Sequence, residues 1–206
     1  MANNTYMSGR KKYKRPQAVL WADDAPTYDS GNGLWLPQGD EVGLGANNKD
    51  NFIILSDHGR KALDFNTERI EKRERMINGR MRAYHIADKL SLNISWDMLP
   101  SRAFNRDPSF SSAGIPDNTD RALSQYTVDG GAGGVDMLEW YQKHTGSFWV
   151  LLAYDKHDNF TTNEYSHIQQ YNEAIEMFFS DFTYSVVKRG GSNYDFWNIT
   201  VKLEEV

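Results

Sequence analysis

Cysteine is absent from all 206 residues of the chain. This absence excludes a disulfide framework and a thiolate zinc site, the devices that stabilise many small domains. The histidines also lack any pair at the i, i+4 spacing that a helical metal site uses; they are His58, His85, His144, His157 and His167. We therefore expect a fold that is held together by packing and by partners, with no metal and no cofactor.

Long apolar runs are absent as well. No window approaches the roughly 20 apolar residues of a membrane span. The N-terminal segment Met1–Arg15 is polar and then basic, without the apolar stretch that a signal peptide needs. We expect a protein without a membrane anchor that is made in a cytoplasm-like compartment.

Local catalytic motifs are missing too, because the chain has no Gly-x-Ser-x-Gly, Gly-x-x-x-x-Gly-Lys or Gly-x-Gly-x-x-Gly. The run Gly130–Gly134 precedes a predicted helix, but no strand leads into it, and we interpret it as a flexible linker. The cluster Asp155–Asn159 lacks the glycine and the terminal glutamate of a calcium loop, so we interpret it as a polar turn. We expect no catalytic residue and a protein that is not an enzyme.

What the chain does contain is enough apolar material for one core. Hydrophobic residues make up 39% of it and aromatic residues 13%, although the mean hydropathy of -0.68 indicates long polar segments around that core. The charge is uneven: residues 1–102 hold 16 Lys and Arg against 13 Asp and Glu, whereas residues 103–206 hold 7 against 15. Such a chain could stack on its own copies through complementary faces, or each half could simply solvate its own surface.

Residues 1–51 are rich in glycine and asparagine and show no sustained period of 2 or 3.6. We predict an extended N-terminal arm there, with little regular structure of its own, and a single β-domain over residues 52–206. Tryptophans in an extended arm usually pack against another surface, so Trp21 and Trp35 are candidates for a contact with another subunit. We expect the arm to be ordered only against that subunit.

Strand patterns begin at Phe52–Leu55. The clearest local signal is Asn78-Gly79, which lies between two strand-like runs and predicts a type I′ turn in a hairpin of Arg69–Ile77 with Arg80–Ala87. A third strand is predicted after it, because apolar and polar residues alternate from Leu90 to Met98.

Residues 101–134 read as a long loop. A helix is predicted at Asp136–Thr145, with Asp136 as its N-cap, Gly146 as its stop and an apolar face of Val135, Leu138 and Tyr141. The apolar run Phe148–Tyr154 predicts a central strand that is covered on both faces. We expect Ile168–Phe179 to be an ordered connection into a strand at Phe178–Lys188, which turns into a closing strand around Trp197–Leu203. The fold class is mainly β, a β-sandwich or open barrel with one flanking helix.

The predicted hairpin is strongly basic, with only Glu71 and Glu74 against Arg69, Lys72, Arg73, Arg75, Arg80 and Arg82. A nucleic-acid-binding protein would use such a patch on phosphates. The net charge of -5 and the lack of stacking aromatics beside the arginines favour salt bridges to an acidic neighbouring subunit instead. The residues that we name as interface candidates here are Arg73, Arg75, Arg80 and Arg82.

The order of these elements resembles the tail-tube and distal-tail family of bacteriophage proteins. The hairpin on Asn78-Gly79, the strand that ends at Trp96-Asp97-Met98-Leu99-Pro100, the helix that leads into Ser147–Tyr154 and the closing pair carry this resemblance. It implies a non-catalytic virion protein that is assembled in the host cytoplasm. It also implies hexameric rings with other tail proteins, around a channel through which DNA passes without sequence-specific binding. The long N-terminal arm departs from a minimal tube subunit and keeps a distal-tail, baseplate or minor-tail role open.

Two other functions remain open on the sequence. Aromatic richness and acidic loops would also suit a carbohydrate-binding β-sandwich, provided that its tryptophans are exposed. A glycosidase is a further alternative, because its two carboxylates need only meet in space.

Overall fold

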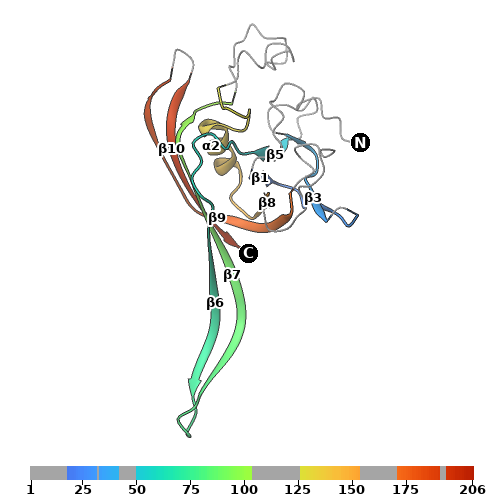
Figure 1. Cartoon of the computed structure of the whole chain (residues 1–206), viewed down its shortest axis with the longest axis vertical. Helices are drawn as coiled ribbons and strands as arrows, with labels where there is room; N and C mark the ends of the chain where they lie inside the picture. Colours follow the sequence, from blue (N-terminus) through green and yellow to red (C-terminus); the bar gives the residue numbers. More distant parts are fainter. Residues whose placement is uncertain (1–17, 32, 42–49, 104–125, 154–170, 191–193) are drawn as a thin grey trace.

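The computed structural model describes residues 18–31, 33–41, 50–103, 126–153, 171–190 and 194–206. These residues form ten strands and one helix (Figure 1), which confirms a mainly β fold with a flanking helix. In chain order the elements are β1 (Val19–Ala22), β2 (Thr27–Asp29), β3 (Leu34–Leu36), β4 (Asp40–Glu41), β5 (Asp50–Ile54), β6 (Asp64–Arg75), β7 (Met81–Pro100), α2 (Gly134–Lys143), β8 (Phe148–Leu152), β9 (Glu173–Arg189) and β10 (Asp195–Glu205).

Eight of the strands form one sheet, in the order β4-β5-β1-β8-β9-β10-β7-β6, and β2 pairs with β3 in a small separate ribbon. All neighbours in the large sheet are antiparallel except β4 and β5. The sheet curves around α2, which lies between β10 on one side and β1, β5 and β8 on the other (Figure 1). No helix among the described residues is long and apolar enough to cross a membrane.

The main core fills the inside of this curve. Buried side chains of β1, β5 and β8 pack in one cluster with those of β7, β10 and α2, because alternate residues of each strand point inward. A smaller cluster lies on the other face of β1, β5 and β8 and includes Leu151 and Tyr171. The strand β8 is therefore covered on both faces, as the apolar run at Phe148–Tyr154 predicted for its described part.

The expectation of an irregular N-terminal arm is wrong for the part that the structure describes. Strand β1 lies inside the sheet, between β5 and β8, and pairs antiparallel with both. All four of its residues are buried, which is the reason that they are Val-Leu-Trp-Ala without alternation. The segments 1–17 and 42–49 lie outside the described residues.

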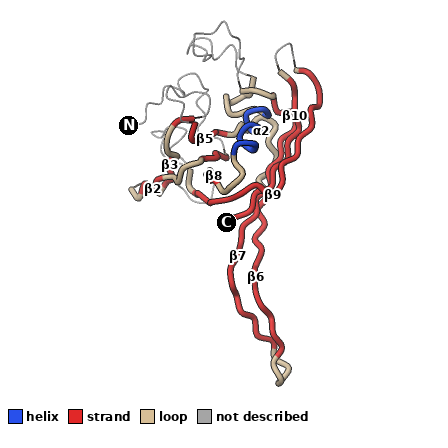
Figure 2. The backbone as a smooth tube through the Cα atoms, turned by 180° about the vertical axis from the view of Figure 1, so that it is seen from behind, coloured by secondary structure: helices blue, strands red, loops and turns tan. Residues whose placement is uncertain are grey.

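The predicted basic hairpin is confirmed, and it is longer than the sequence indicated. Strand β6 pairs with β7 from Asp64↔Asn93 out to Arg75↔Met81. The predicted second and third strands are one strand, β7, which is 20 residues long. Its inner half pairs with β10 and its outer half leaves the body of the protein as a protruding ribbon (Figures 1 and 2).

The turn of this hairpin differs from the predicted type I′ turn. Met76 N–H donates to the Arg80 carbonyl at 2.8 Å, and Gly79 N–H donates to the Met76 carbonyl at 2.8 Å. Only Gly79 has a positive φ, of 78°, whereas Asn78 does not. The loop is thus a three-residue turn that closes on a left-handed glycine. Asn78 uses its side chain instead, and its Oδ1 accepts a hydrogen bond from Arg80 N–H at 3.1 Å.

Gly79→Val tests this turn. No atom lies within 4 Å of the position that a Cβ would take, so the expected cost is conformational, about 1–2 kcal/mol for a β-branched residue at positive φ. The hairpin protrudes, and the loss should therefore appear as faster hydrogen exchange of its amides rather than as global unfolding. Gly79→Asn is the matched control, because asparagine tolerates this conformation. Equal exchange rates in the two variants would contradict the turn assignment.

Helix α2 begins at Gly134, two residues before the predicted start. Gly133 is the N-cap, and Asp136 caps from inside the first turn by accepting a hydrogen bond from Gly133 N–H at 2.9 Å. The most buried large side chains of the helix are Met137 and Trp140. The predicted face is shifted accordingly: Val135 and Leu138 are half-buried, and Tyr141 is 37% exposed and stacks on Phe182.

The last two strands form a second long hairpin. Strand β9 begins at Glu173, so the interpretation of the residues up to Phe179 as a connection is wrong from that point on. Phe179 and Phe182 of β9 lie opposite Leu203 and Val201 of β10, and both pack against the core. The closing pair of β9 with β10 is confirmed. The tip of its turn, 191–193, and the residues 168–170 lie outside the described part of the chain.

Candidate functional site

The outer half of the β6–β7 hairpin has no strand beside it on either edge within the described residues. Strand β6 is the last strand of the sheet, and β7 pairs with β10 only between Ser91 and Pro100. Both backbone edges of the ribbon are therefore free to pair with another chain. An isolated two-stranded ribbon is marginally stable in water, so this part of the hairpin gains little support from its own fold.

Large apolar side chains are exposed along this ribbon. Ile77 at the turn is fully exposed, at 111% of its reference area, and Ile86 is 67% exposed. Ile86 is the extra residue of a β-bulge, because Ile70 faces Ala87 whereas Glu71 faces His85. Exposed apolar side chains on a protruding element are typical of interaction surfaces. Those of the outer half are Ile70, Met76, Ile77, Met81, Tyr84 and Ile86, and Phe65 lies at the base of the hairpin, opposite Leu92.

The basic residues of the hairpin fall into two groups. Those nearer the body are paired within the ribbon: Arg69 with Asp88 at 3.0 Å, Lys72 with Glu74 at 2.6 Å, and Arg73 with Glu71. Hydrogen bonds from Arg69 and then from His85 lower the pKa of the exposed Asp88. Among the described residues, the three arginines at the turn make no ion pair; we call Arg75, Arg80 and Arg82 the tip arginines.

The structure thus places the four arginine candidates on one exposed element, with Arg73 already paired to Glu71. The two tryptophan candidates lie elsewhere. Trp21 is fully buried in the core of its own chain, so its side chain is not available to a neighbouring subunit. Trp35 is half-buried, and its ring lies 4.9 Å from that of Tyr28.

The two halves of the sequence, whose charge differs, do not form two separate bodies among the described residues. Strand β10 of the second half pairs with β7 of the first, and β1 pairs with β8. The halves interleave in one sheet, and within it the hairpin carries a local excess of basic residues. Between positions 75 and 82 the chain has three arginines and no acidic residue.

Exposed tryptophans, which motivated the carbohydrate-binding alternative, are not found. All six tryptophans of the chain lie in the described residues, and each is buried or half-buried. Trp21, Trp96, Trp140 and Trp197 belong to the main core. Their aromatic rings contribute to packing, which leaves no exposed indole on which a sugar could stack.

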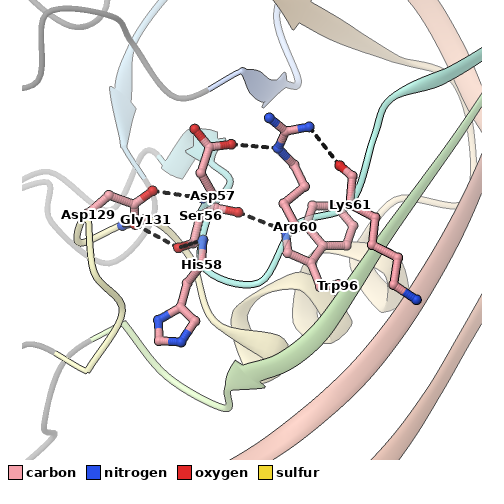
Figure 3. Close-up of polar contacts among 8 residues, drawn as sticks. All are labelled: Ser56, Asp57, His58, Arg60, Lys61, Trp96, Asp129 and Gly131. Carbon is pink, nitrogen blue, oxygen red and sulfur yellow. Dashed lines mark hydrogen bonds and ion pairs between the residues drawn. The ribbon is translucent and has the colours of Figure 1, made fainter.

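A second candidate site is a polar network between the loop after β5 and the turn before α2 (Figure 3). Asp129 is 3% exposed and lies at its centre. Its Oδ1 accepts hydrogen bonds from Ser56 Oγ at 2.6 Å and Gly131 N–H at 3.0 Å, and its Oδ2 accepts one from Asp57 N–H at 2.7 Å. Trp96 Nε1 donates to the Ser56 carbonyl at 2.7 Å and joins this network to β7.

This network contains a serine, a histidine and an aspartate, but its geometry is not that of a nucleophilic triad. Ser56 is fully buried, and its hydroxyl donates its hydrogen bond to Asp129 instead of to a histidine. The His58 ring accepts a hydrogen bond from Val128 N–H on Nδ1 at 3.3 Å, and burial lowers the pKa of His58 although Asp129 opposes this. The network joins the loop after β5 to the turn before α2.

The glycine run Gly130–Gly134 takes part in this network, and its interpretation as a flexible linker is wrong. Residues 129–134 are buried. A Cβ on Gly131 would lie 2.6 Å from Ser56 Cα, and one on Gly133 would lie 2.5 Å from Arg102 N. The glycines are required because the backbone passes directly against two other segments. The sequence signal was real, but it indicated close approach rather than flexibility.

A hollow of about 350 Å³ lies at the base of the hairpin, where β6, β7 and β10 run side by side. Sequence reasoning gave no indication of it. We call it the basal hollow; it is lined by Asp64, Phe65, Asn66, Ser91, Leu92, Asn93, Lys202, Leu203 and Glu204. No group of three or more potential metal ligands occurs among the described residues. The cluster Asp155–Asn159 lies outside them.

Comparisons with known proteins give little further information. No family model and no curated protein matches the chain. Among solved structures, it is similar to a chain from the tail of an empty GTA particle with C6 symmetry, at 10% identity and a TM-score of 0.35. That similarity covers 86% of this chain and 94% of the other. A TM-score this low does not establish a shared fold, and we base no functional argument on it.

Proposed function

We propose that this protein is a structural subunit of a bacteriophage tail that associates with copies of itself and with other tail proteins through the β6–β7 hairpin. The observation that carries the proposal is a ribbon with exposed apolar side chains, whose two edges and tip arginines have no partner within the described part of the chain. Such an element is marginal alone and becomes stable when a neighbouring subunit covers it.

The assignment to a tail rests on the order of elements along the chain. The basic hairpin, the helix before a buried strand and the closing β9–β10 pair, on which the resemblance to tail-tube and distal-tail proteins was based, are all present as structural elements. In this proposal the subunits form a ring around the DNA channel, with six-fold symmetry as the family pattern. The protein has no catalytic role, and DNA passes without base-specific contacts.

Removal of the ribbon tests the proposal. A variant in which residues 70–86 are replaced by a short Asn-Gly turn keeps every strand pair of the body, because β7 meets β10 only from Ser91 onward. We expect the wild-type protein to form rings or tubes and the shortened variant to remain a folded monomer. Mass photometry and negative-stain imaging measure the assembly state, and circular dichroism verifies the fold.

Two outcomes would contradict the proposal. A shortened variant that assembles like the wild type would show that the ribbon is not the contact. A wild-type protein that stays monomeric at all concentrations, but binds duplex DNA with a steep salt dependence that the variant loses, would favour phosphate binding by the arginines.

A further inference from the structure

The basal hollow is lined by residues at the base of the β6–β7 ribbon, and the hairpin tip is the far end of that ribbon (Figures 1 and 2). The chemistry of the two is complementary. Six polar side chains of the hollow lie on one face of the sheet in two rows across three strands. The strand register aligns Asp64, Asn93 and Lys202 in one row, and Asn66, Ser91 and Glu204 in the other. Side chains that are paired across strands, or two apart along a strand, share a face.

The hollow presents acceptors without a full set of donors. The Oδ1 atom of Asn93 is buried and has no hydrogen-bond partner among the described residues. Of the two carboxylates, Glu204 accepts one hydrogen bond, from Ser180 Oγ at 2.7 Å, and Asp64 makes no ion pair in the described part of the chain. Lys202 is the one cation among the described residues that line the hollow. A buried acceptor without a donor is costly, and a donor from outside would remove that cost.

The hairpin tip presents the converse, donors without acceptors. Arg75, Arg80 and Arg82 are exposed, and the segment between 75 and 82 holds no carboxylate. A guanidinium carries five N–H donors in a planar fork, which suits a carboxylate together with an amide oxygen. The six polar side chains are the part of the lining that such a donor would meet, because Leu92 and Leu203 point to the other face of the sheet and are buried in the core.

We propose that the tip arginines of one copy bind in the basal hollow of a second copy. Within one chain the length of the ribbon separates the two, so the contact must join different copies. It is head-to-tail, since different surfaces meet, and such a contact propagates from copy to copy instead of closing a two-fold dimer. The inference rests on the proposed function and adds the partner surface: the hairpin reaches the next subunit along the long axis of the molecule.

A charge exchange tests this contact. The tip variant is Arg75→Glu with Arg82→Glu, and the hollow variant is Asp64→Lys with Glu204→Lys. Each should weaken self-association at least about tenfold, because like charges then face each other across the contact. The combination of all four substitutions should restore association, since opposite charges meet again. Sedimentation velocity over a concentration series gives the dissociation constants, and thermal melting verifies that each variant folds.

A matched control reverses two exposed acids outside the hollow, Glu68→Lys with Glu139→Lys, and should associate like the wild type. Normal assembly of the hollow variant would overturn the inference, as would a combined variant that stays monomeric although it is folded. In both cases an assembling wild type would leave the proposed function standing. A wild type that does not associate would instead overturn the proposed function and this inference together.

Discussion

Trp21→Ala should lower the free energy of unfolding by about 3–5 kcal/mol, the range for truncation of a large aromatic side chain in a core. The side chain of Trp21 is fully buried. Its ring lies 5.7 Å from that of Phe148 and 5.3 Å from that of Phe179, both in edge-to-face geometry. Its strand lies inside the sheet, paired with β5 and β8, so the cavity would lie where little can move to fill it. Chemical denaturation followed by tryptophan fluorescence measures the change.

Trp35→Ala is the matched control for that experiment. Trp35 is half-buried in the smaller cluster and contacts Tyr28 at the surface, so its truncation should cost clearly less. The comparison also decides between two roles for Trp21. A Trp21→Ala monomer with unchanged stability but lost assembly would restore it as an interface residue and contradict its place in the core.

Asp129→Ala should lower the free energy of unfolding about as much as Trp21→Ala does, by about 3–5 kcal/mol. The substitution leaves Ser56 Oγ, Asp57 N–H and Gly131 N–H without the acceptor that they share, and both Ser56 and Gly131 are buried. Each buried donor without a partner costs roughly 1–3 kcal/mol. The loops around residues 56 and 130 would separate first, and faster hydrogen exchange at Asp57 and Gly131 would report it.

Asp57→Ala provides the comparison for this network. The side chain of Asp57 is 39% exposed and forms an ion pair with Arg60 at 2.6 Å, and a surface pair of this kind contributes less than about 1 kcal/mol. If both aspartate variants were equally stable, the buried network would not be what fastens the loops. If Asp129→Ala abolished a catalytic activity while the fold stayed intact, a structural role for the network would be wrong.

Local signals in the sequence predicted a large part of this fold. Asn78-Gly79 placed the hairpin correctly, since any tight turn between two strands needs a residue that tolerates positive φ. The alternation of Leu92, Ile94 and Trp96 gave the buried face of β7. These features depend on neighbours in sequence, which explains the success of a residue-by-residue argument.

Features that depend on distant neighbours could not be predicted in the same way. Strand β1 has four residues between polar segments, and its role is set by β5 and β8, which lie far along the chain. The basal hollow is formed by three strands in register, so no single stretch of sequence contains it. The arginines of the hairpin could be identified from the sequence, because side chains at the tip of a hairpin are exposed independently of the rest of the fold.

The pairing of β1 with β8 also sets the order in which the chain is able to fold. Trp21 pairs with Val150, so β1 lacks one of its two neighbours until residue 150 has been synthesised. The β6–β7 hairpin joins residues that are near in sequence and is complete before β8 is made, so it is expected to form early. Until β8 arrives, the apolar residues of β1 need protection from aggregation. We therefore expect closure of the sheet by β1 to be the slow, long-range step of folding.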